Sequence, residues 1–246
     1  VSIRVSCHKS RLYHSDAIAR STVAAIEQRL GAPSPVLKAG QESDQPPQLI
    51  VIRLVEDICT VSADSSGVLL HKRGYRQAVA KAPLRETLAA ALLMASGWDH
   101  AAPLLDPFCG SGTIAIEAAL WAQGIPPGIR RCYAFMDWPG YDAKLWQSIL
   151  AEVLPLPAQQ PRIQASDRDA GAIRMAQDNA ERAGVAAAIE FQCQAVSSIT
   201  PPSIRGWVVT NPPYGLRVSE GKDLRNLFAQ FGNVLHEKCP GWELAV

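Results

Sequence analysis

The sequence predicts an α/β protein in which helices cover a mostly parallel sheet. Apolar, β-branched segments alternate with helical segments along residues 83–246, and this order is typical of parallel sheets. A glycine-rich turn between a strand and a helix, within residues 104–123, is a second sign of a ligand-binding α/β fold. Polar residues follow three predicted strands, namely Asp106, Asp167 and Asn211, so we expect a site at the carboxyl edge of the sheet.

Residues 1–72 predict a smaller α+β module before the larger one. Ser15 as N-cap and Gly31 as stop bound its helix, and Glu56-Asp57 marks the turn of a hairpin. Residues rich in proline, glycine and polar side chains predict a loop after the helix. The expected elements are a strand at 3–7, a helix at 15–30, a loop at 32–48, strands at 49–55 and 58–62, and a short strand at 68–71.

Residues 73–82 are predicted to form a basic linker between the two modules. Arg73 and Arg76 are expected to contact phosphates, and Tyr75 to stack on a base, as in the binding of single-stranded nucleic acid. A solvated hinge explains the same composition, so both interpretations stay open.

The charge is distributed unevenly along the chain. Residues 1–81 contain 11 Lys and Arg against 7 Asp and Glu, whereas residues 82–246 contain 13 against 16. Phosphate contacts supply most non-specific affinity for nucleic acids. A basic module beside a more acidic one therefore suits an RNA partner, although an ordinary solvated surface has the same appearance.

In the larger module, helical and β-strand patterns alternate. Helices are expected at 84–96, 112–123, 169–183 and 222–236, and strands at 103–106, 162–166, 188–193 and 206–210. An insertion of about 40 residues follows the second of these helices. Its Arg130, Arg131 and aromatic residues are expected to hold a base or close over the site. Alternatively, a helix at 142–153 packs Leu145, Trp146 and Ile149 on the sheet.

The glycine-rich turn suggests which ligand the site binds. Gly110 and Gly112 allow close backbone approach, and the helix that follows favours a carboxylate or phosphate at its N-terminus. With Ala115 the segment also matches a dinucleotide fingerprint, which requires an acid about 20 residues on. The next acid at the end of a strand is Asp167, 55 residues after Gly112. This spacing favours S-adenosylmethionine over NAD. Within the turn, Cys109 is expected to be a small apolar filler.

Asp167 follows the strand at 162–166 and opens a helix that ends at Gly184. A carboxylate in this place can accept hydrogen bonds from both ribose hydroxyls. Asp167 could instead be the N-cap of the helix, with Asp169 as a favourable charge at the helix N-terminus.

Asn211-Pro-Pro-Tyr214 follows the buried strand at 207–210 and predicts transfer to a planar amino group. The Asn211 side-chain oxygen and the Pro212 carbonyl can each accept one N–H bond and draw the nitrogen towards tetrahedral geometry. Pro213 stiffens the loop, and Tyr214 can stack on an extruded base. An ordinary Asn-Pro turn after a strand is the alternative.

These motifs resemble those of amino-methyltransferases. Together with Gly67–Arg76 and Ala82–Leu92, they are similar to the THUMP-containing RNA guanine-N2 methyltransferases, bacterial large-subunit rRNA type. The resemblance implies a Rossmann-like fold at 83–246 that uses S-adenosylmethionine, preceded by a partial, RNA-binding THUMP-like domain. It also implies that 23S rRNA is methylated in the cytoplasm. The implied cofactor residues are Asp106, Phe108, Gly110, Ser111, Gly112, Thr113, Asp167, Arg168, Ala195 and Asn211.

One residue departs from the family pattern. Where an acidic residue usually accepts a bond from the adenine amino group, this sequence has Ala195, and Gln194 or the backbone is expected to make that contact. The resemblance places Asp106 near the methionine amino group and Asp167 on the ribose. Both chain ends resemble interrupted domains, and a complete sheet of this family needs roughly 40–60 further residues.

Other functions remain open. A transfer-RNA guanine methyltransferase is the nearest alternative, followed by enzymes that methylate DNA adenine or protein glutamine. A binding-only RNA module with lapsed catalysis belongs to another class, and an NAD-dependent oxidoreductase is disfavoured by the position of Asp167. The six cysteines show no C-x-x-C spacing, which argues for reduced thiols and against a metal. No apolar run reaches the length of about 18 residues that a membrane span needs.

Overall fold

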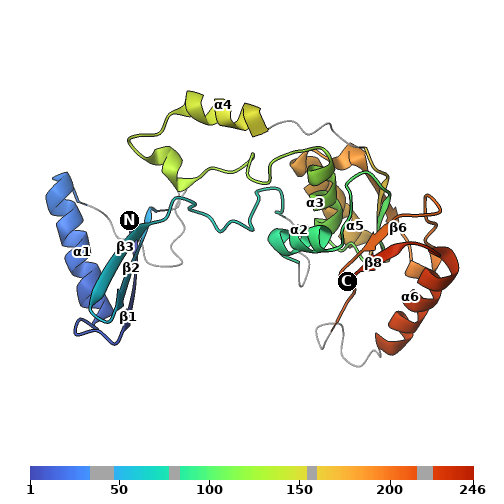
Figure 1. Ribbon diagram of the computed structural model, residues 1–246, viewed down its shortest axis with the longest axis horizontal. Helices are drawn as coiled ribbons and strands as arrows, with labels where there is room; N and C mark the ends of the chain where they lie inside the picture. The colour runs from blue at the N-terminus through green and yellow to red at the C-terminus, as the bar shows by residue number, and fades with distance from the viewer. Residues whose placement is uncertain (34–46, 78–83, 154–159, 215–223) are drawn as a thin grey trace. The chain divides into compact units, whose positions relative to one another are not determined.

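The computed structural model describes residues 1–33, 47–77, 84–153, 160–214 and 224–246 (Figure 1). The chain divides into two compact units. The first contains Val1–Leu69 and Cys132–Lys144, and the second contains Leu70–Arg131 and Leu145–Val246.

The first unit has a three-stranded sheet with the order β1-β2-β3. β1 (Ser2–His8) runs parallel to β2 (Leu49–Val55), which pairs antiparallel with β3 (Ile58–Ala63); the helix is α1 (Ser15–Leu30). Glu56 and Asp57 both have positive φ angles, 50° and 65°, as the right-handed twist of a two-residue hairpin turn requires. The predicted hairpin is confirmed.

Two details of this unit differ from prediction. His14, not Ser15, is the N-cap of α1. The strand expected at 68–71 does not form, because the chain turns just before it. The Asp64 carboxylate accepts bonds from the backbone N–H groups of Ser66 (2.9 Å) and Gly67 (3.2 Å), which closes that turn.

Residues 132–144 of the insertion pack within the first unit. Phe135 N donates to the Ser65 carbonyl at 3.2 Å, and Trp138 Nε1 donates to Gln48 Oε1 at 2.6 Å. This segment contains a 3-10 helix (Ala134–Asp137) and the first two residues of α4 (Ala143–Val153), whose remaining residues belong to the second unit. Leu145 and Ile149 of α4 are 58% and 42% exposed, so the prediction that they pack on the sheet is wrong.

The second unit contains a parallel five-stranded sheet with the order β6-β5-β4-β7-β8. The predicted α/β fold is confirmed, and the boundaries of the predicted elements are correct to within two residues; residues 222 and 223 lie outside the described part. Its strands and helices are α2 (Glu86–Ala95), β4 (Leu104–Asp106), α3 (Thr113–Ala122), β5 (Ile163–Asp167), α5 (Ala170–Ala183), β6 (Ile189–Cys193), β7 (Trp207–Val209), α6 (Leu224–Lys238) and β8 (Glu243–Ala245).

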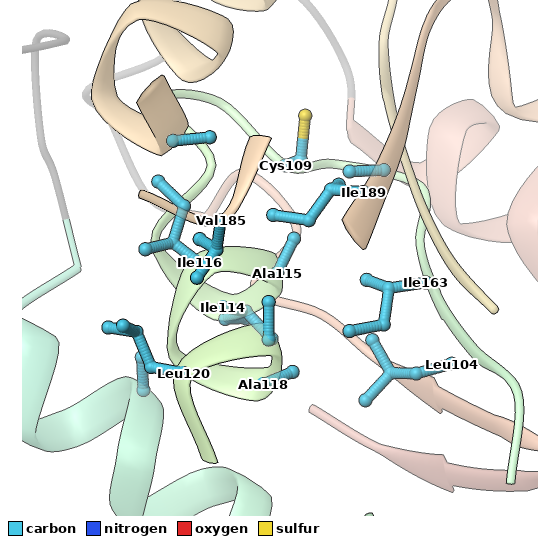
Figure 2. Close-up of a cluster of buried hydrophobic side chains, with 14 of the residues drawn as sticks. Leu104, Cys109, Ile114, Ala115, Ile116, Ala118, Leu120, Ile163, Val185 and Ile189 are labelled. Atoms are coloured by element: carbon cyan, nitrogen blue, oxygen red, sulfur yellow. The ribbon is translucent and has the colours of Figure 1, made fainter. Parts of the chain in front are cut away.

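The larger of the two hydrophobic clusters of this unit lies between the sheet and α3. Leu104 and Ile163 of neighbouring strands contribute to the cluster that Figure 2 shows, together with Ile114 and Ile116 of α3. Every residue of α3 except Trp121 is buried, because α3 packs against the strands β4 and β5 and is flanked by α2 and α5. This packing holds the start of α3, and hence the turn before it, against the sheet edge.

Within the described residues, no helix is long and apolar enough to cross a bilayer. The same part of the chain has no group of three His, Cys, Asp or Glu side chains placed to hold a metal ion.

Candidate active site

The strands β4, β5 and β7 end at the same edge of the second unit's sheet. β4 lies between the other two, and the chain order reverses between β4 and β7, which is where open α/β sheets bind ligands. Thr210 Oγ1, directly after β7, donates to Asp106 Oδ1 at 2.6 Å, and Gly110 N donates to Asp167 Oδ2 at 3.1 Å. The structure thus brings together the predicted glycine-rich turn and both predicted carboxylates.

The turn between β4 and α3 needs its glycines. Gly110 and Gly112 have φ angles of 52° and 82°, in the left-handed region that glycine adopts without steric cost. A Cβ on Gly112 would lie 2.9 Å from Ala176 Cβ of α5. Position 112 therefore requires glycine for its conformation and for the close approach of α5.

We expect Gly112→Ala to destabilise the protein by about 1–3 kcal/mol, the cost of a strained backbone residue. Its melting temperature should fall, as measured by calorimetry. Gly232→Ala in α6 is the matched control, because a Cβ there would meet nothing within 4 Å. Equal melting temperatures for the two variants would show that position 112 is not constrained.

The remaining side chains of the turn are buried. Ser111 and Thr113 are each 4% exposed, and Cys109 N donates to the Ser166 carbonyl at 3.0 Å. Figure 2 shows Cys109 beside the apolar cluster. Burial raises the pKa of the Cys109 thiol well above its usual range, so the prediction of an apolar filler fits.

Asp106 has the most perturbed environment in the site. It is 1% exposed, and burial raises its carboxyl pKa from 3.8 to about 7, with the Asp167 charge as a smaller cause and the bonds from Thr210 and Phe108 N opposing it. Oδ1 accepts from both of those groups. Oδ2 is buried and accepts no bond from any described residue. Asp106 is therefore ready to accept a bond from a cationic donor.

Asp167 supports the glycine-rich turn with one carboxylate oxygen and the start of α5 with the other. Oδ2 accepts from Gly110 N, and Oδ1 accepts from Asp169 N at 3.0 Å. The N-cap of α5 is Asp169, whose Oδ1 accepts from Gly171 N at 2.7 Å. The alternative in which Asp167 caps this helix is therefore wrong. Each Asp167 oxygen has a second lone pair available for a hydroxyl donor.

The Asn211-Pro-Pro-Tyr214 segment leaves the sheet directly after Thr210. Thr210 is fully buried, and its N–H donates to the Ala245 carbonyl at 3.1 Å. Asn211 and the two prolines are half-buried. Tyr214 is 68% exposed, so its ring can stack on a base. Residues 215–223 lie outside the described residues.

The remaining predicted cofactor residues lie around this edge. Gln194 N donates to the Asp167 carbonyl at 2.9 Å, and Ala195 is exposed beside it. Phe108 packs edge-on against Phe231 of α6, with ring centroids 5.2 Å apart. Arg168 is exposed. Their contacts to a cofactor remain predictions.

The prediction that Tyr75 stacks on a base, with Arg73 and Arg76 on phosphates, is wrong. Tyr75 is 2% exposed, and its hydroxyl donates to Glu117 Oε1 at 2.8 Å. Arg73 forms an ion pair with Glu117, and Arg76 Nη2 lies 2.5 Å from Glu86 Oε2. All three residues belong to the second unit because buried carboxylates of α2 and α3 hold them.

Glu117, the partner of Arg73 and Tyr75, is buried. Burial raises its pKa from 4.5 to about 7, and the charge of Arg73 opposes this rise. Burial and the charge of Glu117 also raise the pKa of Tyr75 far above its usual value. Tyr75 is therefore a neutral donor to Glu117.

Arg130 and Arg131 differ in exposure. Arg131 is only 9% exposed, so the prediction that it contacts RNA is wrong. Arg130 is exposed, and its guanidinium passes close to Gly184, where an added Cβ would lie 2.5 Å from Nη2. An RNA contact by Arg130 remains a prediction.

Sequence reasoning missed Thr210, Asn179 and Arg182. Thr210 looks like the last residue of a β-branched strand, and only its place before Asn211 marks it. Asn179 and Arg182 look like polar residues of an amphipathic helix. The structure shows that Asn179 is fully buried, which the spacing of apolar residues in α5 does not reveal.

Comparison with known proteins gives consistent results. Residues 73–246 match the family model of the UPF0020, RMKL-like methyltransferase domain. The chain is 42% identical over 197 residues to the ribosomal RNA large subunit methyltransferase K/L of Shewanella sp. (strain W3-18-1). This match covers 77% of the chain but only 28% of the length of that relative.

Two solved structures are similar over almost the whole chain. SMU.472, solved in complex with SAH, has 29% identity and a TM-score of 0.79, covering 99% of this chain and 65% of that one. A predicted N6-adenine-specific DNA methylase from Listeria monocytogenes has 32% identity and a TM-score of 0.81, covering 98% and 64%. The family match extends over more than half of the sequence and includes the whole site. The chain therefore belongs to the UPF0020 family of RMKL-like methyltransferase domains.

Proposed function

We propose that this chain transfers the methyl group of S-adenosylmethionine to the exocyclic N2 of a guanine in RNA, and that the RNA is 23S rRNA. The observation that carries this proposal is the bond from Thr210 to Asp106. It joins the predicted acceptor segment to the carboxylate of the predicted cofactor site. The Shewanella relative supports rRNA as the substrate, and its role in rRNA modification supports a cytoplasmic location.

The residues present fit S-adenosylmethionine. Asp106 Oδ2 can accept a bond from the methionine ammonium, which would give this buried oxygen its missing partner. The Asp167 oxygens can accept from the ribose hydroxyls. The N-terminus of α3, after Gly112, favours the methionine carboxylate. The SAH complex of SMU.472 supports a ligand of this class.

The acceptor segment provides the chemistry that the protein itself performs. Asn211 Oδ1 and the Pro212 carbonyl each accept a hydrogen bond from one of the two N2–H groups of the guanine. Tyr214 stacks on the extruded guanine. When bound, S-adenosylmethionine supplies an electrophilic methyl group. That methyl group would exchange its S–C bond for the new N–C bond to N2, with the thioether as leaving group, and N2 would lose one proton to water. Positioning and hydrogen bonding supply the rate, so no strong base is required.

The first unit is proposed to contact the RNA. Residues 1–69 contain seven Lys and Arg and seven Asp and Glu, so this proposal does not rest on net charge. It rests on the resemblance to half of a THUMP domain at the loop Lys9–His14. Lys9, Arg11 and His14 are all exposed. Exposed Lys and Arg side chains on a small α+β unit are the expected contacts for phosphates.

The proposal is tested by methyl transfer from labelled S-adenosylmethionine to unmodified rRNA and tRNA pools, with mass analysis of the nucleosides. The full-length protein is used, and a variant at Asn211 is the control. N2-methylguanosine in large-subunit rRNA is the expected product. The same nucleoside only in tRNA would change the substrate but not the chemistry. No methylated nucleoside in either pool, with cofactor binding intact, would overturn the proposal.

DNA adenine is a second candidate acceptor, because the similar Listeria structure is described as a DNA methylase. Its N6 amine is also planar and would suit Asn211 in the same way. Adding unmethylated DNA as competitor to the RNA assay separates the two. Transfer of label to DNA at a higher kcat/KM than to RNA would favour this candidate. Label in protein would point to glutamine.

A further inference from the structure

Two side chains of α5 hold the glycine-rich turn from the interior of the second unit. Asn179 is fully buried, and its Nδ2 donates to the Ser111 carbonyl at 3.1 Å. Arg182 Nη2 donates to Asn179 Oδ1 at 2.5 Å, and Arg182 Nε donates to the Tyr75 carbonyl at 2.8 Å. These bonds form a continuous chain from the backbone of Tyr75 to the backbone of the turn.

The side chain of Tyr75 supports the same region by a second route. Its hydroxyl donates to Glu117 of α3, and Arg73 forms an ion pair with the other oxygen of that carboxylate. Because α3 begins at the turn, Tyr75 is connected to the turn through α5 and to the helix that follows it. The buried ring of Tyr75 holds this residue in place, and both the bond to Arg182 and the bond to Glu117 start from it.

The direction of the Ser111 carbonyl matters for the carboxylate group of the proposed ligand. A carbonyl bonded to a fully buried amide faces the protein interior, so its negative end is kept away from the ligand side of the turn. The N-terminus of α3 attracts a carboxylate with its N–H groups. A carbonyl rotated towards the ligand would oppose that attraction. Asn179 therefore acts on the site through Ser111, without touching the ligand.

We infer that Asn179 and Arg182 are positioning residues that hold the Ser111 carbonyl inward and so shape the turn for S-adenosylmethionine. Asn179 makes the bond to the Ser111 carbonyl, and Arg182 fixes the orientation of the Asn179 amide. A guanidinium can only donate hydrogen bonds, so Asn179 must direct Oδ1 towards Arg182 and Nδ2 towards Ser111. The inference rests on the proposed cofactor.

The test is Asn179→Asp, which keeps the shape and the acceptor for Arg182 but removes the donor to Ser111. A buried carbonyl without its partner is costly, so the KM for S-adenosylmethionine should rise about tenfold or more. At saturating cofactor, kcat and the KM for RNA should stay within about twofold, since the change acts on cofactor binding only. Arg182→Lys should shift the same KM by a smaller factor, because lysine lacks the planar fork.

Gln177→Glu is the matched control, since it makes the same amide-to-carboxylate change at an exposed position of α5. Its KM for S-adenosylmethionine should equal that of the unaltered protein. If Asn179→Asp lowers the melting temperature without changing this KM, its role is only structural and the inference is overturned. If the unaltered protein binds no S-adenosylmethionine in calorimetry, the proposed function fails first, and the inference falls with it.

Discussion

Asn211→Ala is expected to abolish methyl transfer while binding of S-adenosylmethionine survives. The side-chain oxygen of Asn211 is the predicted acceptor for one of the two N–H bonds that orient the attacking amine. Removing one preorganised hydrogen-bonding group from a reacting centre typically lowers turnover by about 10²–10³-fold. The substitution leaves Asp106 and Asp167, the carboxylates proposed to bind the cofactor, unchanged. The dissociation constant of S-adenosylmethionine should therefore change by less than about twofold.

Asn233→Ala is the control for this experiment, because Asn233 is an exposed residue of α6 in the same unit. It makes the same chemical change away from the sheet edge and should retain full turnover. Single-turnover kinetics with saturating cofactor separate the chemical step from binding. Unchanged turnover in Asn211→Ala would remove this residue from the mechanism.

Asp106→Asn is expected to weaken binding of S-adenosylmethionine by about 10- to 100-fold, because it removes the negative charge and puts an NH2 donor where Oδ2 would accept from the ammonium. The amide is isosteric, and its oxygen can still accept from Thr210. The protein should therefore stay folded. Titration calorimetry measures the affinity, with Asp178→Asn, an exposed change in α5, as control. Equal affinity in Asp106→Asn would place the ammonium elsewhere.

The raised pKa of Asp106 predicts the pH dependence of stability and binding. Its carboxyl pKa is 3.8 when unfolded and about 7 when folded, so between these values the folded state holds more protons. Stability therefore falls as pH rises through this window. The Asp106→Asn side chain cannot titrate, so the melting temperature of this variant should rise relative to that of the unaltered protein as the pH increases from 4 to 7.

Cofactor affinity should show the opposite trend. The ammonium requires the ionised carboxylate, so affinity should fall about tenfold for each pH unit below 7 and be constant above it. Asp106→Asn should lack this slope. Glu117 titrates in the same range, but it is present in both proteins, and the comparison cancels its contribution. A parallel slope in both proteins would assign the titration to another group.

Several parts of the fold and site could be predicted because neighbouring residues specify them. Glycines at 110 and 112 predicted the turn, and both have left-handed backbone. The alternation of strand and helix patterns predicted the parallel sheet, and parallel strands necessarily carry Asp106, Asp167 and Asn211 to one edge. The family was also identified from these motifs, as the match over residues 73–246 confirms.

Other features depended on partners far away in the sequence. Tyr75 looked like an aromatic residue in a basic linker, but Glu117, 42 residues later, buries it and accepts its hydroxyl bond. Residues 132–144 looked like part of the larger module, but they find their partners at Gln48 and Ser65. A local pattern contains no information on which distant carboxylate or carbonyl will neutralise a charge.

By itself, the sequence determined the order of strands and helices, the glycine-rich turn and the residues at the ends of the strands, because backbone geometry and side-chain periodicity are local properties. Only the tertiary structure decided that Thr210 joins Asp106, that Asn179 holds Ser111, and that Arg73 and Arg76 pair with buried carboxylates. Those outcomes depend on long-range packing, since a polar group is buried only where a partner from another element can satisfy it.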